Sequence, residues 1–180
     1  MYPTIATISN SRGKISIRQA EPADAVPFSE LRLQALHDNP TVFGSSYEAR
    51  ENCSPEWALD ILSADPQQQA SFVAESGGIL LGMTSIRRNH KQKVRHSAGI
   101  AGVYVRPEWR GLGIVDALFK ACFEWAQNQQ VIIVKLAVVT TNPAAFHAYQ
   151  RLGFSVFGTE PKVIYYDGVY YDEYLMSRNI

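Results

Sequence analysis

The sequence predicts a single mixed α/β domain with a mostly antiparallel sheet that carries helices on both faces. Segments with the apolar patterns of strands are interleaved with segments of helical spacing, in the order β-α-α-β-β-β-α-β-α-β-β. Two glycine-containing turns, Gly77-Gly78 and Asp167-Gly168, have the composition of hairpin turns between antiparallel strands. The chain has 180 residues, of which 46% are apolar, so one compact domain with a sizeable core is expected.

Residues 1–13 are mostly polar and are predicted to be a flexible tail before a single domain at residues 14–180. At the start of that domain, Pro22 and Asp24 open the first helix, and Asn39-Pro40 ends it. The predicted elements of the N-terminal half are a strand at 15–18, this helix, a short helix at 55–62, and strands at 71–75, 79–87 and 97–105.

The C-terminal half continues the alternation of helices and strands. Residues 113–127 have helical apolar spacing, with Leu118, Cys122 and Trp125 on one face. The nearly continuous apolar run at 131–139 predicts a strand that is covered on both sides. The remaining predicted elements are a helix from Asn142 to Gly153 and two strands at 156–166 and 169–177.

The charge balance excludes several classes of protein. Lys and Arg total 17 and so do Asp and Glu, which argues against a protein that coats nucleic acid. No apolar run approaches the ~18 residues of a membrane span, and the polar start does not resemble a secretory signal. Cys53 and Cys122 are too few and too far apart for a disulfide scaffold or a metal site. We therefore expect a cytoplasmic protein with no bound metal and no membrane partner.

A glycine-bearing turn between a strand and a helix is the most informative stretch. Gly111 and Gly113 allow the backbone to curl, and Arg110 precedes them with a fork suited to phosphate oxygens. Unpaired amides at the helix start, together with the helix dipole, favour an anion. The turn is therefore either a pyrophosphate cradle or simply a connection that needs glycine. It lacks the Gly-Lys-Ser/Thr of a nucleotide P-loop, and Asp116 stands where a dinucleotide fingerprint needs its third glycine.

A second motif opens and closes the following helix. Asn142 suits an N-cap, and Pro143 suits the first helical position. Gly153 can adopt the left-handed conformation that ends a helix, with Phe154 packed back on the last turn. Capping explains Asn142, Pro143 and Gly153 without any ligand. It does not explain Tyr149, which lies two helical turns after Asn142 on the same face, where a core helix would more simply use leucine.

Together the two motifs resemble the GNAT acetyltransferase superfamily, which moves an acetyl group from acetyl-CoA to a primary amine. The family signature Arg/Gln-x-x-Gly-x-Gly/Ala aligns with Arg110, Gly113 and Val115. The helix pattern Asn-x-x-Ala-x-x-x-Tyr-x-x-x-Gly-Phe aligns with residues 142–154. The opening Ile-Arg-x-Ala-x-Pro-x-Asp of residues 17–24 also looks like the first strand and helix of the family.

The resemblance implies roles for individual residues. Backbone amides of residues 112–116 would hold the pyrophosphate of acetyl-CoA, while the backbone of residues 103–105 and Asn142 would bind the pantetheine arm. Tyr149 would protonate the departing CoA thiolate as a general acid. Gly102 suits a bulge or a close backbone approach, at the place where a family member separates two strands to admit the cosubstrate. The residues assigned to cosubstrate binding are Val103, Tyr104, Val105, Arg110, Gly111, Leu112, Gly113, Ile114, Val115, Asp116, Asn142 and Tyr149, of which Tyr149 is also catalytic.

Val115 and Asp116 depart from what the family pattern favours. Val115 places a β-branched side chain where the family has glycine or alanine, and Asp116 adds negative charge beside a negative ligand, so we hypothesise a weakened affinity for acetyl-CoA. Strand 97–105 contains no acidic residue that could serve as the general base. The candidates for this role elsewhere are Glu48, Glu51, His96 and Glu173, each of which also suits a solvated or structural position.

Acceptor specificity is expected from the loop at 43–51 and from the tyrosine-rich C-terminal hairpin. Its tyrosines would line the acceptor pocket, form a homodimer contact, or simply favour strand structure. Residues 87–96 hold five of the 17 basic residues and are expected to form a solvated loop far from the phosphate turn. The favoured function is acetyl transfer to a small-molecule or peptide amine. The alternatives are a non-catalytic acyl-CoA-binding module on the same fold and nucleic-acid binding through residues 87–96.

Overall fold

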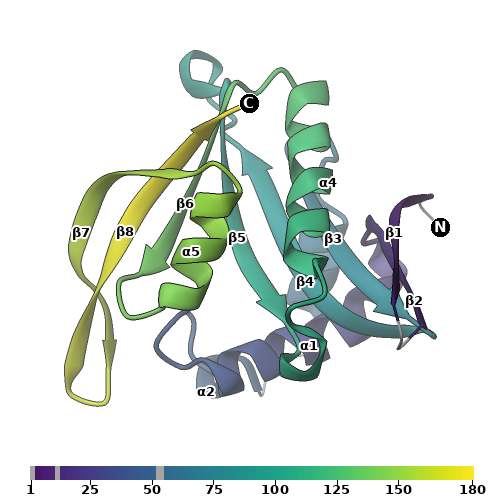
Figure 1. The fold of residues 1–180 in the computed structure, drawn as a ribbon, viewed down its shortest axis with the longest axis horizontal. Coiled ribbons are helices and arrows are strands. Elements are labelled where there is room, and N and C mark those ends of the chain that lie inside the picture. The colour runs from purple at the N-terminus through teal and green to yellow at the C-terminus, as the bar shows by residue number, and fades with distance from the viewer. Residues whose placement is uncertain (1–2, 11–12, 52–54) are drawn as a thin grey trace.

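In the computed structural model, which describes residues 3–10, 13–51 and 55–180, all strands belong to one sheet (Figure 1). The sheet has eight strands in the order β1-β2-β3-β4-β5-β6-β8-β7, and only β5 and β6 pair in parallel. This confirms the predicted mixed, mostly antiparallel architecture. The strands are β1 Thr4–Asn10, β2 Gly13–Gln19, β3 Gln69–Ser76, β4 Ile79–Arg88, β5 Ser97–Val105, β6 Ile133–Val139, β7 Ser155–Tyr166 and β8 Val169–Asn179.

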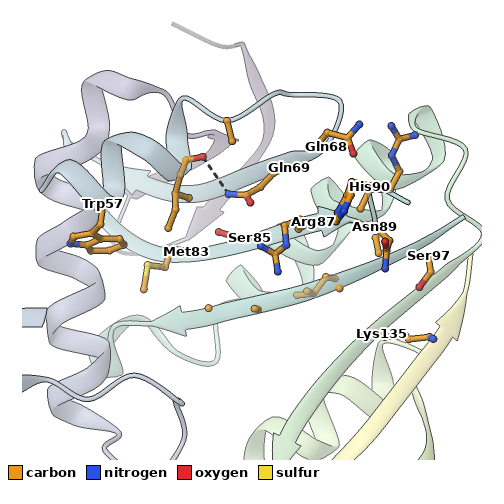
Figure 2. A pocket seen from close by; sticks show the side chains of 18 of the residues that line it. Trp57, Gln68, Gln69, Met83, Ser85, Arg87, Asn89, His90, Ser97 and Lys135 are labelled. Atoms are coloured by element: carbon orange, nitrogen blue, oxygen red, sulfur yellow. Dashed lines mark hydrogen bonds between the residues drawn. The ribbon is translucent and has the colours of Figure 1, made fainter. Parts of the chain in front are cut away.

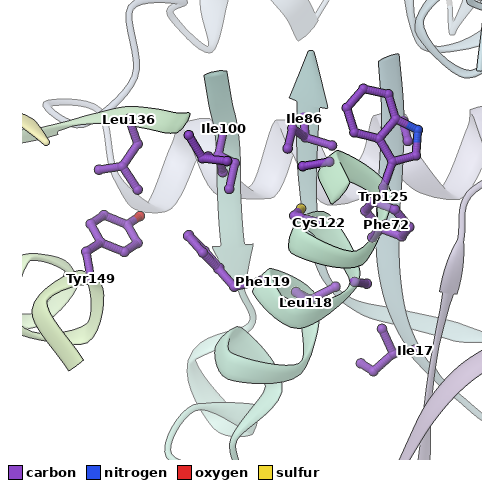
Figure 3. Packing of buried hydrophobic residues seen from close by; sticks show 14 of the residues in the cluster. Ile17, Phe72, Ile86, Ile100, Leu118, Phe119, Cys122, Trp125, Leu136 and Tyr149 are labelled. Carbon is purple, nitrogen blue, oxygen red and sulfur yellow. The ribbon is translucent and has the colours of Figure 1, made fainter. Parts of the chain in front are cut away.

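The helices lie on both faces of the sheet. The α-helices are α1 Ala25–Asp38, α2 Glu48–Glu51, α3 Glu56–Leu62, α4 Ile114–Asn128 and α5 Pro143–Arg151. Three short 3-10 turns occur at Pro22–Asp24, Gln92–Val94 and Pro107–Trp109. Neighbouring residues of β3 point to opposite faces: Phe72 belongs to the core under α4, and Val73 to the core under α1. Figure 3 shows the α4 side, where Leu118, Cys122 and Trp125 pack toward the sheet as the sequence predicted.

The first helix is tied to the sheet by a buried ion cluster. Arg18 on β2 holds both carboxylate oxygens of Asp24, at 2.6 and 2.8 Å, and its Nε donates to Glu75 at 2.8 Å. Burial by itself would raise the pKa of Asp24, but the contacts with Arg18 and the hydrogen bond from the Glu21 N–H together outweigh it and leave that pKa lowered. The cluster therefore fixes the start of α1 against β2 and β3.

The predicted flexible tail is wrong for residues 4–10. This segment forms β1, which pairs antiparallel with β2 through Ala6↔Ile17 and Ile8↔Ile15. Ala6 and Ile8 are partly buried against the core. These two apolar residues stabilise the strand, although the segment as a whole is polar in composition. The helical turn α2 was also not predicted. Cys53 lies outside the described residues.

The prediction that β6 is covered on both sides is wrong as well. Val134, Leu136 and Val138 are buried, but the intervening Lys135 and Ala137 are exposed. Residues of β6 line the two cavities described below.

The two central strands, β5 and β6, are paired at one end only, and we call the gap between their unpaired parts the seam. β5 and β6 pair only through Ser97↔Ile133, Ala98↔Val134 and Gly99↔Lys135. Beyond these pairs, β5 stays bonded to β4 and β6 to β8, so the two strands part. Figure 1 shows them close together at one end and separated at the other, where α5 lies. The separated end exposes the backbone of β5 on the side that faces β6.

Candidate active site

The turn between β5 and α4 has the backbone shape that its glycines predicted. Gly111 and Gly113 have φ angles of 77° and 76°, in the left-handed region that glycine adopts without strain. Gly113 is the N-cap of α4 and offers no side chain to the helix start. The first backbone bond of the helix runs from the Ala117 N–H to the Gly113 carbonyl at 3.1 Å. The amides of residues 114–116 at the start of α4 therefore remain for an anion.

Arg110 is held at the same turn by two contacts. Its Nε donates to the Val105 carbonyl at 3.0 Å, and its guanidinium lies 5.9 Å from the centre of the Tyr104 ring. These contacts fix the guanidinium at the end of β5 and leave its two terminal nitrogens available to a phosphate.

Val115 does not point freely into the turn. It is half-buried and packs against the core cluster under α4, although it also contributes to the wall of the adjacent cleft. Asp116 is exposed and lines the same cleft. The unusual negative charge is therefore placed at the cleft.

Strand β5 is distorted at the position expected from Gly102. Met83 pairs with Tyr104 and Ser85 with Ala101, so one residue of β4 faces two of β5, and Gly102 has a φ of 68°. This is the β-bulge that the sequence predicted. Because residues 103–105 pair with β4 and not with β6, their other edge faces the seam.

The side chain of Tyr104 has a structural contact in addition to its place on β5. Its hydroxyl donates to Asp38 Oδ2 at 2.6 Å and so connects β5 to the end of α1. This hydrogen bond lowers the pKa of Asp38, while burial and the same bond raise the pKa of Tyr104.

Helix α5 has the caps predicted for it. Asn142 Oδ1 accepts from the Ala145 N–H at 3.1 Å, which leaves its Nδ2 without a hydrogen bond to any described residue. At the other end Gly153 has a φ of 84°, and the Phe154 N–H donates to the Tyr149 carbonyl at 3.0 Å, as in a Schellman motif.

Tyr149 projects from α5 toward the seam. Its ring packs 5.4 Å from that of Phe119, and only 7% of the residue is exposed. Figure 3 shows the hydroxyl pointing toward Leu136 of β6 and Ile100 of β5. No described residue hydrogen-bonds to this hydroxyl. Burial raises the pKa of Tyr149, so the phenol keeps its proton.

These parts surround one cleft of about 660 Å³. Its walls come from the glycine turn, residues 100–105 of β5, residues 136–138 of β6, and α5 with Asn142 and Tyr149. Val42 and Phe43, which follow α1 on the opposite face of the sheet, also line it. The cleft thus passes through the seam from one face to the other. Of the predicted cosubstrate residues, all but Leu112 line it.

A second cavity of about 980 Å³ lies over the α1 face, and Figure 2 shows its interior. Met83, Ser85 and Arg87 of β4 form its floor, with Trp57 of α3 at one end and His90 near the other. We call it the acceptor-side groove. It shares Arg32, Ile100, Ala101 and Gly102 with the cleft, so the two cavities meet at the bulge of β5.

Sequence reasoning did not single out Arg32. It lies four residues after Phe28 and three before Ala35, both of which are buried, so it stands on the apolar face of α1. A charged residue at a core position of an amphipathic helix was the signal that could have revealed it.

The four candidates for the general base differ in whether they line the cleft. Glu48, Glu51 and His96 are exposed and do not line the cleft, whereas Glu173 of β8 does. Burial and the neighbouring Glu160 raise the pKa of Glu173 above its usual range. Cys122 is fully buried, and burial raises its pKa, which excludes a reactive thiolate as predicted.

The basic segment at 87–96 is far from the phosphate turn, as expected, because it precedes β5 and the turn follows it. It is not wholly solvated, however. Arg88 is buried and donates to the Gln129 carbonyl at 2.9 Å. Arg87, Asn89, His90 and Lys91 line the acceptor-side groove.

Neither a membrane-spanning helix nor a metal-binding cluster occurs among the described residues. No helix among them is both long and apolar enough to cross a membrane. Likewise, residues 3–10, 13–51 and 55–180 contain no cluster of three or more His, Cys, Asp or Glu arranged to hold a metal ion.

Comparison with known proteins identifies the family of the chain. The pattern of the acetyltransferase (GNAT) family matches residues 33–154, so the chain belongs to this family. It is therefore an acyltransferase that uses acetyl-CoA as its cosubstrate.

Individual relatives indicate the range of acceptors in the family. The L-amino acid N-acetyltransferase AaaT of Escherichia coli (strain K12) is 27% identical over 166 residues, which cover 92% of this chain and 98% of that protein. The aminoglycoside N(6′)-acetyltransferase type 1 of Stenotrophomonas maltophilia is 26% identical over 117 residues, or 63% of this chain and 68% of that protein. The structure of yncA from Salmonella typhimurium with its cofactor acetyl-CoA has a TM-score of 0.79 at 21% identity and covers 92% of this chain and 93% of that one.

Proposed function

We propose that this chain transfers the acetyl group of acetyl-CoA to the primary amine of a small molecule by direct attack of the amine on the thioester. The observation that carries the proposal is the cleft that runs from the open start of α4 through the seam to the α1 face of the sheet. The relatives act, by name, on L-amino acids and on aminoglycosides, which are both small amines.

Different residues of the cleft would bind different parts of the cosubstrate. The amides at the start of α4 and the terminal nitrogens of Arg110 would bind the two phosphates, because both groups line or border the cleft and neither has a described partner. The free edge of residues 103–105 supplies backbone groups to the amides of the pantetheine arm. Asn142 Nδ2 adds a donor there, because the oxygen of the same side chain is used by the helix cap.

Tyr149 is the proposed hydrogen-bond donor to the departing sulfur. As the amine nitrogen forms the new amide bond, the carbon–sulfur bond breaks, and the sulfur needs a hydrogen-bond donor. Tyr149 is protonated, lines the cleft and has no described partner for its hydroxyl, so it can fill this role. Its raised pKa lies above the value of about 8.5 typical of a thiol, so it acts chiefly by hydrogen-bonding the developing thiolate.

Glu173 is the proposed acceptor of the amine proton. A carboxylate with a raised pKa is a stronger base than an ordinary one, but it exists only above that pKa. The rate constant kcat/KM should therefore fall as the pH drops through the pKa of Glu173. Glu173→Gln should lower kcat/KM about 100-fold near neutral pH. Glu160→Gln removes the like charge and should move the acidic limb of the profile to lower pH. An unchanged profile in both variants contradicts this role.

The central experiment measures CoA release with acetyl-CoA and a panel of small primary amines. We expect amine-dependent turnover, and Tyr149→Phe should lower kcat about 10- to 100-fold with little change in the KM for acetyl-CoA. The melting temperature should change little, because no described residue bonds to the hydroxyl that is removed. A protein that binds acetyl-CoA but turns over no amine would instead be the non-catalytic acyl-CoA-binding module.

A further inference from the structure

The acceptor-side groove has an unusual distribution of charge. Among its described lining residues there is no aspartate and no glutamate. Figure 2 shows Arg87 and Lys135 on opposite sides of the groove, on β4 and β6. The cationic side chains that line it are Arg32, Arg50, Arg87, Arg88, Lys91 and Lys135. Since the chain as a whole carries no formal net charge, this is a local concentration of positive charge.

Two of these arginines lie at the end of the groove that meets the cleft. Arg32 lines both cavities, and its Nη1 is buried without a hydrogen-bond partner. A buried, unpaired guanidinium nitrogen costs free energy unless a ligand supplies the acceptor. Arg50 lines the same groove and is near enough to Arg32 to lower its pKa electrostatically.

Aromatic rings, not carboxylates, hold the two guanidinium groups. Arg32 lies 4.3 Å from the centre of the Phe43 ring, and Arg50 lies 4.9 Å from that of Trp57. Cation–π contacts fix the position of a guanidinium while leaving its in-plane N–H groups to bond elsewhere. Burial, with a contribution from Arg50, lowers the pKa of Arg32 to about 10, so the group is still charged at neutral pH. Two like charges without a described counter-ion form a site prepared for an anion.

On the basis of the proposed function, we infer that the acceptor is an amine carrying a carboxylate, as in an α-amino acid, and that Arg32 with Arg50 binds this carboxylate. Arg32 stands where the groove meets the cleft, beside the Gly102 bulge, so a carboxylate there places a neighbouring amine at the seam. A planar guanidinium can bind a carboxylate through two parallel hydrogen bonds, which also fixes its orientation.

The rest of the groove extends this selectivity. An acceptor side chain that leaves the Arg32 end runs toward Arg87 and Lys91. We therefore expect acidic amino acids such as glutamate to be preferred over basic ones. The same charges repel a polycation, so an aminoglycoside should be a poor acceptor.

The test compares two acceptors that differ only in the carboxylate next to the amine. Glutamate and its α-amide are assayed at equal concentrations of the neutral amine, with lysine as a cationic acceptor. The wild-type kcat/KM should be at least about 10-fold higher for glutamate than for the α-amide. Arg32→Gln should raise the KM for glutamate about 10- to 100-fold and change that for the α-amide by less than about 3-fold. Arg32→Lys should restore part of the loss.

Arg95→Gln is the control. Arg95 is an exposed arginine of the basic segment at 87–96 and does not line the groove. It should leave both acceptors unaffected. Equal use of glutamate and its α-amide by the wild type overturns the inference but leaves the proposed function intact. An equal loss of both acceptors in Arg32→Gln also overturns it.

Binding measured without turnover separates this inference from the proposed function. If no amine is acetylated, the proposed function fails, and ligand-observed NMR with glutamate then tests the site directly. Binding that is lost in both Arg32→Gln and Arg50→Gln but kept in Arg95→Gln supports the anion site. Binding that is equal in all of them refutes it.

Discussion

Helices α4 and α5 begin at the same cleft but complete their first turns in different ways. α5 uses its own side chain, since Asn142 accepts from the Ala145 N–H, and a Schellman motif closes its other end. α4 begins at Gly113, which has no side chain to offer and holds a left-handed φ of 76°. The start of α5 is capped by its own side chain, whereas the first amides of α4 have no partner within the helix. The residues that cap a helix therefore indicate whether its start is structural or binds an anion.

The strongest test of this comparison changes the start of α4. In the Gly113→Ala variant, an alanine at this position would have to adopt a left-handed conformation, which costs about 1–2 kcal/mol. If the backbone relaxes instead, the amides at the start of α4 no longer point to one place. We expect the Kd for CoA, measured by calorimetry, to rise about 10-fold or more.

The control for that variant is Gly78→Ala in the β3–β4 turn. Gly78 has a similar φ of 82°, and an added Cβ at either glycine meets no atom within 4 Å. Both variants should lose a few degrees in melting temperature, but only Gly113→Ala should lose affinity for CoA. Equal affinities in the two variants would mean that the α4 start does not bind the phosphates.

A smaller effect is expected at the start of α5, where the cap and the ligand contact can be separated. Asn142→Ala removes both and should cost about 1 kcal/mol of stability, or about 2–4 °C in melting temperature, and weaken CoA binding several-fold. Asn142→Ser keeps a capping oxygen but no amide donor, so stability should return while the affinity stays low. If serine restores both properties, Asn142 is only a cap.

The smallest effect concerns the charge of Asp116. Its carboxylate complements the α4 dipole but opposes an anionic ligand at the same place, and each such interaction is worth about 0.3–1 kcal/mol. Asp116→Ser should tighten CoA binding about 2- to 5-fold at low salt and less at high salt. Glu124→Gln removes an exposed charge near the other end of α4 and should change nothing. Unchanged binding in Asp116→Ser shows that this residue does not weaken affinity.

The parts of the fold set by local backbone chemistry could be predicted from the sequence. The two hairpin turns, the left-handed glycines and both caps of α5 all depend on residues adjacent in the chain. For example, Asp167 and Gly168 have φ angles of 45° and 77°, as the predicted tight turn requires.

What could not be predicted depends on residues that meet only in the folded chain. β1 needed the partner strand β2 to reveal its apolar edge, and Lys135 and Ala137 could not be recognised as exposed without knowing that the sheet opens beside them. The candidates for the general base show the same limit. Four residues were equal candidates in the sequence, and only the path of β8 brings Glu173 to the cleft.

The exposed Lys135 of β6 and Arg32 on the apolar face of α1 depart from the expected pattern for the same reason. Each lines a cavity, whereas a packed core at these positions would have used apolar side chains. Departures from the simplest folding pattern therefore concentrate where a ligand is expected.

The seam has a mechanical consequence for the whole sheet. Because only three residue pairs join β5 to β6, the sheet consists of a five-strand ribbon and a three-strand ribbon that are fastened at one end. If the pantetheine arm binds along the free edge of β5 as proposed, its amides would add hydrogen bonds there and would stiffen the junction between the two ribbons. The melting temperature should then rise with the fraction of the protein that has this ligand bound.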